Sequence, residues 1–352
     1  MSKYMQSRFA SLEAYVPGEQ PQDKKYIKLN TNESPYPPSP GVLAAVNAGE
    51  AAKLRLYPDP ECKVLTKKLA ALLDVEPENV FITNGSDDSL NFAFMAFAGP
   101  ETPAVFADIT YGFYKVFAQL HGIPARVIPL KPDFTLDPAD YYNAGGMVVI
   151  ANPNAPTGLP RTRNELEEVI RRNPDHVVVV DEAYVDFGGE SCIPLTKKYD
   201  NLLVVQTFSK SRCLAGGRLG FAVGHKDLIA DLTKLKYSTN PYCINRLTLV
   251  AGEAAVDENE YYMDHCREIM DTRKATTDAL RGLGFEVLPS AANFIFARPP
   301  KMSGEALYLA LKDRGVLVRY FSAPRTCEYV RITIGTPAEM AVLVQAVREI
   351  CG

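Results

Sequence analysis

The sequence predicts an α/β protein with two domains, the larger of them built on a mostly parallel sheet. Its 352 residues exceed what one hydrophobic core usually organises, so a large domain plus a smaller one is expected. Short β-rich runs alternate with helical patterns over much of the chain, which favours a parallel sheet with helical crossovers. Two of these runs, 147–150 and 177–180, are continuously apolar, as strands covered by helices on both faces are.

The expected elements follow in order along the chain. Residues 1–40 are expected to form an irregular arm, because six prolines between Pro17 and Pro40 leave a helix little room. The larger domain, residues 41–255, is expected to contain helices at 61–74 and 86–98 and strands at 80–83, 104–107, 147–151, 177–180, 202–207 and 219–223. A long helical stretch from about 241 through 282 leads into a smaller α+β domain, residues 256–352, with strands at 285–288, 293–297, 316–318 and 329–334 and helices at 303–314 and 337–350.

The composition limits the kinds of partner. The net charge is −4, the pI is near 5.7 and no dense Lys/Arg tract occurs, so neither nucleic acid nor an anionic membrane is expected to bind. The seven cysteines form no C-x-x-C pair and the histidines do not cluster, which gives little support to a disulfide framework or a metal site. The N-terminus lacks a signal-peptide pattern, and no apolar run has the length of a membrane span. A cytoplasmic protein that acts on small molecules is expected.

Lys210 stands just after the apolar run 202–208 and is the residue that most specifically indicates chemistry. Asp181 closes another apolar run 29 residues earlier, and Arg218 follows eight residues later. Pyridoxal 5′-phosphate requires this set: an amine for a Schiff base with the aldehyde, a carboxylate that keeps the pyridine nitrogen protonated, and a guanidinium for the phosphate. Most lysines are solvated surface residues, but this order and setting favour a cofactor site.

Other strand ends supply matching groups. The turn Asn84–Asp87 opens a helix and is suited to a phosphate, although Ser86 or Asp87 can equally be a simple N-cap. Tyr111 can stack on a planar ring, although such an aromatic is more often a core residue. Asn154 lies in a proline-rich turn and can donate to a phenolic oxygen, as can Tyr184. Asp181 and Glu182 could be metal ligands, but the sequence has no His or Cys cluster that would complete a metal site with them.

These residues and several motifs make the chain resemble the fold-type I pyridoxal-phosphate-dependent aminotransferases over essentially its full length. Within that family it resembles the histidinol-phosphate aminotransferase branch. The motifs are Lys28–Pro35 (KLNTNESP), Leu56–Pro60 (LYPDP), Thr207–Lys210 (TFSK), Leu214–Gly220 (LAGGRLG) and Val330–Thr336 (VRITIGT). The resemblance implies a large domain with a mostly parallel seven-stranded sheet flanked by helices, a smaller α+β C-terminal domain, and an N-terminal arm packed with the small domain.

The resemblance also implies a role for each site residue. Lys210 would carry the cofactor, Asp181 would pair with the pyridine nitrogen, and Asn154 and Tyr184 would reach the phenolic oxygen with Tyr111 over the ring. The phosphate would be surrounded by Gly85, Ser86, Asp87, Thr207, Ser209, Arg218 and, from the second subunit of a homodimer with shared active sites, Tyr57. The substrate would be bound by Tyr15, Asn32, Arg319 and Arg331.

The implied reaction converts L-histidinol phosphate and 2-oxoglutarate to imidazole acetol phosphate and L-glutamate. Departures from the family pattern at Ala155, Gly217 and Ser211–Cys213 leave the substrate open, because the loop that carries Arg212 can face the pocket. The alternatives are an aromatic amino acid aminotransferase and a threonine-phosphate decarboxylase on the same scaffold. A pyridoxal-phosphate-sensing regulator is not expected, because the proline-rich first 40 residues leave no room for a DNA-binding module.

Overall fold

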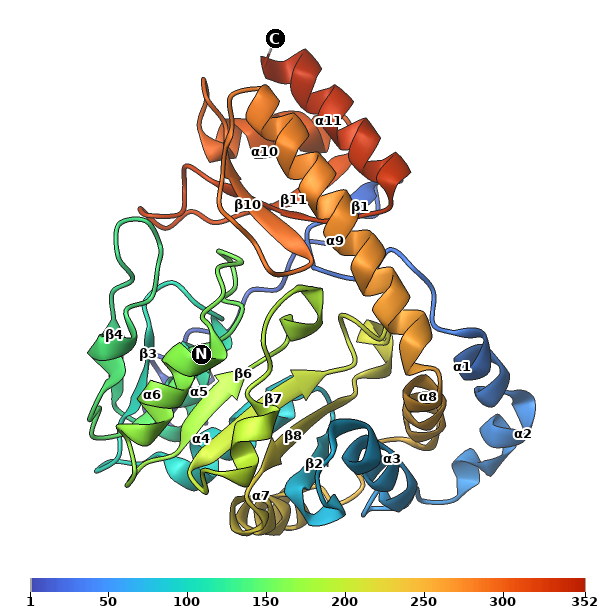
Figure 1. The fold of residues 1–352 in the computed structure, drawn as a ribbon, viewed down its shortest axis with the longest axis vertical. Coiled ribbons are helices and arrows are strands. Elements are labelled where there is room, and N and C mark those ends of the chain that lie inside the picture. Colours follow the sequence, from blue (N-terminus) through green and yellow to red (C-terminus); the bar gives the residue numbers. More distant parts are fainter. Residues whose placement is uncertain (1, 352) are drawn as a thin grey trace.

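Two β-sheets organise the chain in the computed structural model, which describes residues 2–351 (Figure 1). The larger sheet has seven strands in the order β2-β8-β7-β6-β5-β3-β4, and only β8 runs antiparallel to its neighbours. The mostly parallel sheet predicted from the sequence is therefore confirmed. Its strands are β2 (Val80–Thr83), β3 (Ala104–Ala107), β4 (Ala125–Ile128), β5 (Met147–Ala151), β6 (Val178–Asp181), β7 (Leu202–Thr207) and β8 (Gly220–Gly224).

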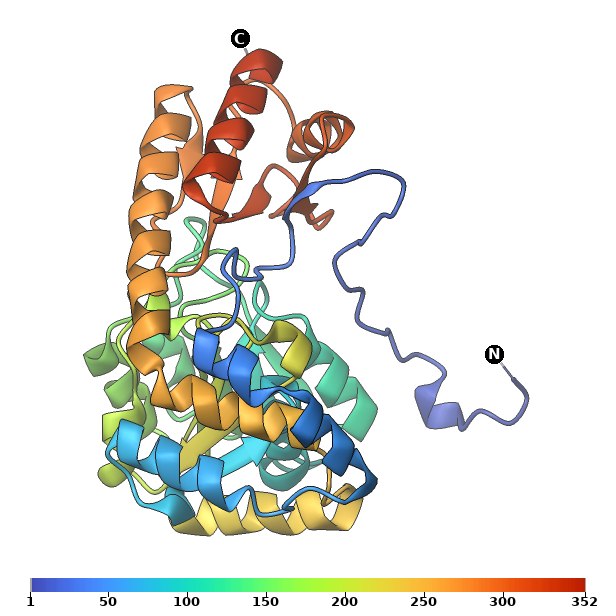
Figure 2. The same ribbon diagram turned by 90° about the vertical axis from the view of Figure 1, so that its right-hand side faces the viewer.

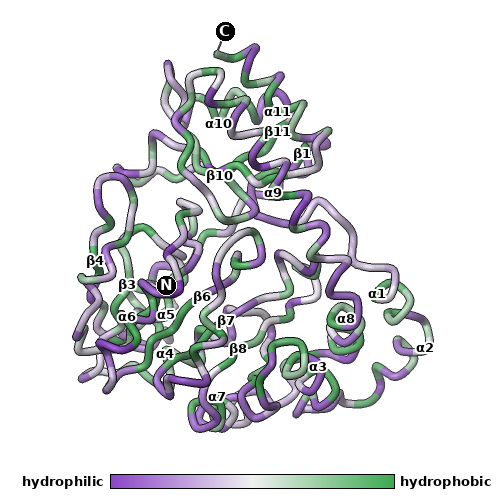
Figure 3. The backbone as a smooth tube through the Cα atoms, in the orientation of Figure 1, coloured by the Kyte–Doolittle hydropathy of each residue, from purple (hydrophilic) through white to green (hydrophobic). Residues whose placement is uncertain are grey.

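Helices cover both faces of this sheet because the inner strands are apolar on both sides. Val178 and Val180 of β6 pack into one hydrophobic cluster and Val179 into another, as the alternation of side chains along a strand requires. Figure 3 shows the hydrophobic residues along β6. The first face is covered by α3 (Lys63–Leu73), α6 (Arg163–Arg171) and α8 (Arg246–Asp257), and the second by α4 (Ser86–Phe97), α5 (Phe113–His121) and α7 (Lys226–Thr239).

The smaller sheet has five strands in the order β1-β11-β12-β10-β9. Its strands are β1 (Ile27–Leu29), β9 (Glu286–Val287), β10 (Phe294–Arg298), β11 (Val316–Tyr320) and β12 (Val330–Thr333), and they form one hydrophobic cluster with α9 (Asn259–Gly282), α10 (Gly304–Asp313) and α11 (Pro337–Cys351). Helix α9 runs from the side of the larger sheet up along the smaller one (Figures 1 and 2).

Two sequence-based expectations are wrong. The arm is not wholly irregular, because its strand β1 pairs in parallel with β11 and so joins the smaller sheet. The N-terminal end of the arm extends to one side of the molecule (Figure 2), whereas Glu13 and Tyr15 contact Lys115 and Phe113 of α5. The helical stretch predicted from 241 through 282 is two helices, since α8 ends at Asp257 and α9 begins at Asn259, after a linker at Glu258 that is not helical. The short helices α1 (Pro40–Ala45) and α2 (Ala48–Ala51) join the arm to α3.

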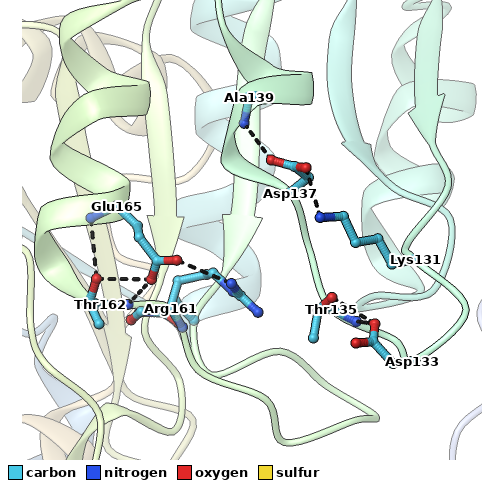
Figure 4. Close-up of polar contacts among 9 residues, drawn as sticks. Lys131, Asp133, Thr135, Asp137, Ala139, Arg161, Thr162 and Glu165 are labelled. Atoms are coloured by element: carbon cyan, nitrogen blue, oxygen red, sulfur yellow. Dashed lines mark hydrogen bonds and ion pairs between the residues drawn. The ribbon is translucent and has the colours of Figure 1, made fainter.

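A capped helix closes the turn that follows β5. Thr162 Oγ1 accepts from the Glu165 backbone N–H at 3.3 Å, and the Glu165 carboxylate accepts from the Thr162 N–H at 2.8 Å (Figure 4). The neighbouring Arg161 places its backbone N–H 2.7 Å from Asn152 Oδ1. The start of α6 therefore holds both ends of the loop that carries Asn154.

Among residues 2–351, every helix is too short or too polar to cross a bilayer.

Candidate active site

Lys210 lies three residues beyond the end of β7, at the edge of the larger sheet that faces the smaller one. Its Nζ donates to the carbonyl oxygen of Thr31, in the arm, at 3.3 Å and lies 5.8 Å from the centre of the Tyr184 ring. Burial, followed by the nearby Arg331 charge, lowers the pKa of Lys210 from 10.5 to about 8. The amine therefore exchanges a proton close to neutral pH.

Asp181 ends β6, the strand that pairs with β7, and only 5% of its surface is exposed. Its carboxylate accepts from Tyr114 Oη at 2.7 Å and from the Ala183 N–H at 3.2 Å. Within residues 2–351, no cationic side chain forms an ion pair with it. Burial raises the pKa of Asp181 from 3.8 to about 6, because no cation compensates the lost hydration.

Tyr114 is a site residue that the sequence analysis missed. It lies on α5, is fully buried and reaches Asp181 from 67 residues away in the chain. Burial, followed by the Asp181 charge, raises the pKa of its hydroxyl far above the usual value, so it remains a hydrogen-bond donor. The apolar spacing of Phe113, Val116 and Phe117 was the available signal, because it indicates a helix with a buried face directly after Tyr111.

The turn before α4 and Arg218 come together, as the sequence predicted for a phosphate site. Gly85 has a φ of +81°, and a Cβ atom there would lie 2.7 Å from Arg218 Nη2. Asp87 accepts from Arg218 Nη2 at 3.1 Å and from Tyr111 Oη at 2.8 Å. Ser86 is the first residue of α4, so unpaired backbone N–H groups of its first turn face the same region.

The two remaining turns are fixed by their own side chains. Asn154 Nδ2 donates to the Ile109 carbonyl and to Thr157 Oγ1, both at 3.0 Å, and its Oδ1 accepts from Thr110. After β7, Thr207 Oγ1 accepts from the Ser209 N–H at 3.1 Å. These bonds orient the turns that carry Asn154 and Lys210.

Asn32 joins the arm to both sheets. Its Nδ2 donates to Tyr184 Oη at 3.0 Å, and its Oδ1 accepts from Thr333 Oγ1 at 3.0 Å. Tyr184 follows β6 and Thr333 ends β12, so one buried amide links the larger sheet, the smaller sheet and the arm. The structure thus places Asn32 and Tyr184 beside each other, as their joint prediction as site residues requires.

Arg319 and Arg331 are directly opposite each other in the antiparallel pair β11–β12. Arg319 donates to the carbonyls of residues 16 and 17, Arg331 donates to Asn30, and both guanidiniums lie about 5.5 Å from the Phe321 ring. Within residues 2–351, neither has a carboxylate partner. Like charges at opposite positions repel, so this pair is suited to a shared anion. Nearby, Tyr15 stacks on Phe113 at 4.3 Å and lies 6.1 Å from Tyr111.

Two residues do not join this group. Tyr57 is 78% exposed and stacks on Tyr242 at 4.5 Å. The sequence left open whether the loop that carries Arg212 faces the pocket; the Arg212 side chain is 95% buried and bonds to Asp186 and Asn259. The hydrogen bond to Asn259 places the guanidinium at the start of α9.

Comparisons with known proteins identify the family of the chain. The profile of the family described as aminotransferase class I and II matches residues 24–347, and the chain belongs to this family. Within it the chain groups with the histidinol-phosphate aminotransferases. That of Marinomonas sp. is 51% identical over 99% of this chain and 100% of the relative, and that of Brachyspira hyodysenteriae is 51% identical over 99% of each. The histidinol-phosphate aminotransferase of Sinorhizobium meliloti, solved with pyridoxal-5′-phosphate, shares the fold, with a TM-score of 0.88, 23% identity and coverage of 100% and 98%.

Proposed function

We propose that the protein is a pyridoxal-phosphate-dependent aminotransferase that moves an amino group between L-histidinol phosphate and 2-oxoglutarate. The observation that carries this is a buried amine with a lowered pKa, Lys210, just after β7, together with a buried carboxyl, Asp181, at the end of the neighbouring strand β6, for which residues 2–351 supply no ion-pair partner. The substrate assignment rests on the 51% identity to relatives named histidinol-phosphate aminotransferase.

The residues present fit this cofactor. A protonated ring nitrogen would supply a positive charge to Asp181, whose donors within residues 2–351 are two neutral groups. The turn at Gly85 and the exposed guanidinium of Arg218 would hold the phosphate. Arg218 would then exchange its bond with Asp87 for bonds to phosphate oxygens. Tyr111, Asn154 and Tyr184 would contact the ring.

Lys210 Nζ is both the amine that would attach to the cofactor aldehyde and the base that would take the proton from the substrate Cα. The bound cofactor supplies an electron sink that makes this proton acidic. A pKa of about 8 suits the task, because a base works best when its pKa lies near the working pH. The contact with the Thr31 carbonyl would orient the neutral amine.

Arg331 and Arg319 would recognise the anionic end of each substrate. Their nearest polar partners are neutral carbonyls, so two positive charges are available for a phosphate ester or a carboxylate. A guanidinium can bind either group through two parallel hydrogen bonds, which a lysine cannot. One pocket would therefore serve both half-reactions.

The test is a panel of amino donors with 2-oxoglutarate, scored by the glutamate formed. Histidinol phosphate is expected to be preferred over phenylalanine. Release of carbon dioxide from threonine phosphate without glutamate would instead identify a decarboxylase. Lys210→Ala should abolish steady turnover and still bind the cofactor non-covalently; appreciable turnover by this variant would contradict the role of Lys210.

We also infer a homodimer whose active sites are shared. Tyr57 belongs to a group of hydrophobic side chains between 41% and 78% exposed on neighbouring segments: Leu43, Val46, Leu54, Leu56, Tyr57 and Tyr242. Such a group is typical of a protein interface. A second subunit placed over it would bring Tyr57 to the partner's phosphate site.

Light scattering measures the mass, and mixing two inactive variants tests the sharing. Lys210→Ala and Tyr57→Ala chains, refolded together, should regain up to about a quarter of wild-type activity, because random pairing leaves one intact site in half of the dimers. No regain would contradict the shared site.

All seven cysteines are unpaired thiols, which supports a reducing compartment, and we propose the cytoplasm.

A further inference from the structure

Arg212 is a buried cation that the proposed chemistry does not use. Its side chain is 5% exposed, on the turn two residues after Lys210. One guanidinium nitrogen donates to Asp186 Oδ2 at 3.2 Å and to Ser211 Oγ at 3.2 Å, and the other donates to Asn259 Oδ1 at 2.9 Å. The guanidinium carbon also lies 5.5 Å from the Phe208 ring centre. Burying a charge is unfavourable unless an ion pair and hydrogen bonds compensate for the lost hydration, as Asp186, Ser211 and Asn259 do here.

The partners of Arg212 belong to three different segments. Asp186 lies two residues after Tyr184, in the short helix Val185–Phe187, and it also accepts from Ser211 Oγ. Asn259 is the first residue of α9, which packs in the smaller domain's core. One side chain therefore connects the Lys210 turn, the Tyr184 turn and the start of the helix that reaches the smaller sheet.

We propose that Arg212 is a positioning residue that holds the Lys210 turn against the Tyr184 turn and the N-terminus of α9. Its planar guanidinium group donates from two nitrogens and so binds Asp186 and Asn259 at once; a lysine could bind only one of them. This inference rests on the proposed role of Lys210. It assigns Arg212 no contact with substrate or cofactor.

The environment of Lys210 makes the positioning measurable. Burial is the largest influence on its amine, and the charged groups that face it are Arg331, Glu33, Asp87 and Arg218. If the turn loosens, water reaches Nζ and the cost of its charged form falls. The proton would then be held more tightly, and a smaller fraction of the amine would be neutral at a given pH. This effect differs from a simple loss of stability.

The experiment follows the attachment of added pyridoxal phosphate to Lys210 in cofactor-free protein, by absorbance, from pH 6 to pH 10. The attachment rate depends on the fraction of Lys210 that is neutral. In the wild type, the midpoint, which is the pH at which this rate reaches half of its maximum, is therefore expected near 8. Arg212→Met should move this midpoint upward by about one pH unit, which slows attachment about tenfold at pH 7. Arg212→Lys should give an intermediate shift, because lysine keeps the positive charge but cannot donate to both partners at once.

Arg171→Met is the matched control, because Arg171 forms an exposed ion pair with Glu168 on α6. Circular dichroism and urea midpoints establish that each variant is folded. A folded Arg212→Met with the wild-type midpoint, or an equal shift in Arg171→Met, would overturn the inference. If Arg212→Met does not fold, Asp186→Asn replaces it, and an unchanged midpoint there has the same meaning. Failure of the wild type itself to attach the probe would contradict the proposed function instead.

Discussion

Tyr114→Phe removes one hydroxyl from the interior and tests how Asp181 is supported. The Tyr114 hydroxyl donates to Asp181 at 2.7 Å, and within residues 2–351 the only other hydrogen bond to this carboxylate comes from the Ala183 N–H. A hydrogen bond to a charged group contributes about 1.5–3 kcal/mol, and a bond between neutral groups about half of that. The cost of the substitution should therefore depend on whether Asp181 is ionised.

The direction with pH follows from the pKa of Asp181. It is raised from 3.8 to about 6 on folding, so the stability contributed by its protonated form is fully present below pH 4 and is lost as the pH rises through 6. A shift of this size corresponds to about 3 kcal/mol. The Tyr114 hydrogen bond opposes the shift, so its removal raises the pKa of Asp181 further. We expect Tyr114→Phe to cost about 2 kcal/mol at pH 8 and about 1 kcal/mol at pH 5.

Urea unfolding of cofactor-free protein at the two pH values measures this difference. Tyr141→Phe is the matched control, because Tyr141 is 1% exposed and its hydroxyl finds no hydrogen-bond partner in the part of the chain that the structure describes. Its loss should be neutral or slightly stabilising at both pH values. The reasoning is refuted if Tyr114→Phe costs the same at pH 5 and pH 8, or no more than Tyr141→Phe.

Two further substitutions test the phosphate turn and the contact between the sheets. In Gly220→Ala the new Cβ would lie 2.4 Å from the Gly85 carbonyl carbon, so we expect pyridoxal phosphate to bind at least about tenfold more weakly in a titration. Gly216→Ala is the control: a Cβ there would meet open space, and we expect its affinity to stay near that of the wild type. Arg325→Gln breaks a partly exposed ion pair with Asp108 at 3.0 Å and should cost about 0.5–1 kcal/mol in urea unfolding; a cost that persists undiminished at 1 M salt would contradict an electrostatic origin.

The inner strands of the larger sheet were predictable because burial on both faces leaves a continuous apolar run. Strand β4 was missed for the opposite reason: it is an edge strand in which Ala125, Arg126 and Val127 are exposed. Helix α6 did carry a signal, since Thr162 and Glu165 form a capping box in the sequence itself. The break between α8 and α9 had no such signal. It occurs at Glu258, whose carboxylate accepts from the Gly41 N–H at 2.9 Å, a contact set by tertiary structure.

The site was predictable to the extent that its groups follow strands. Lys210, Asp181 and the Asn84–Asp87 turn all come after apolar runs, and parallel strands bring their ends to one edge. Tyr114 and Arg212 lie on a helix and in a turn, and what they do depends on partners 67 and 26 residues away. Their roles follow from packing, which the local sequence pattern does not encode.

The adjacent carboxyls Asp181 and Glu182 illustrate how packing resolves what the sequence leaves ambiguous. Both are buried, and burial raises the pKa of Glu182 to about 7. Along an extended chain, neighbouring side chains point to opposite faces. Glu182 accepts three hydrogen bonds, from Ser191 Oγ, the Cys192 N–H and Gln206 Nε2, so it anchors the following loop and has little capacity left. Among the described residues, Asp181 has two hydrogen-bond donors and no cationic partner, so of the two it is the carboxyl that a cationic ligand would stabilise.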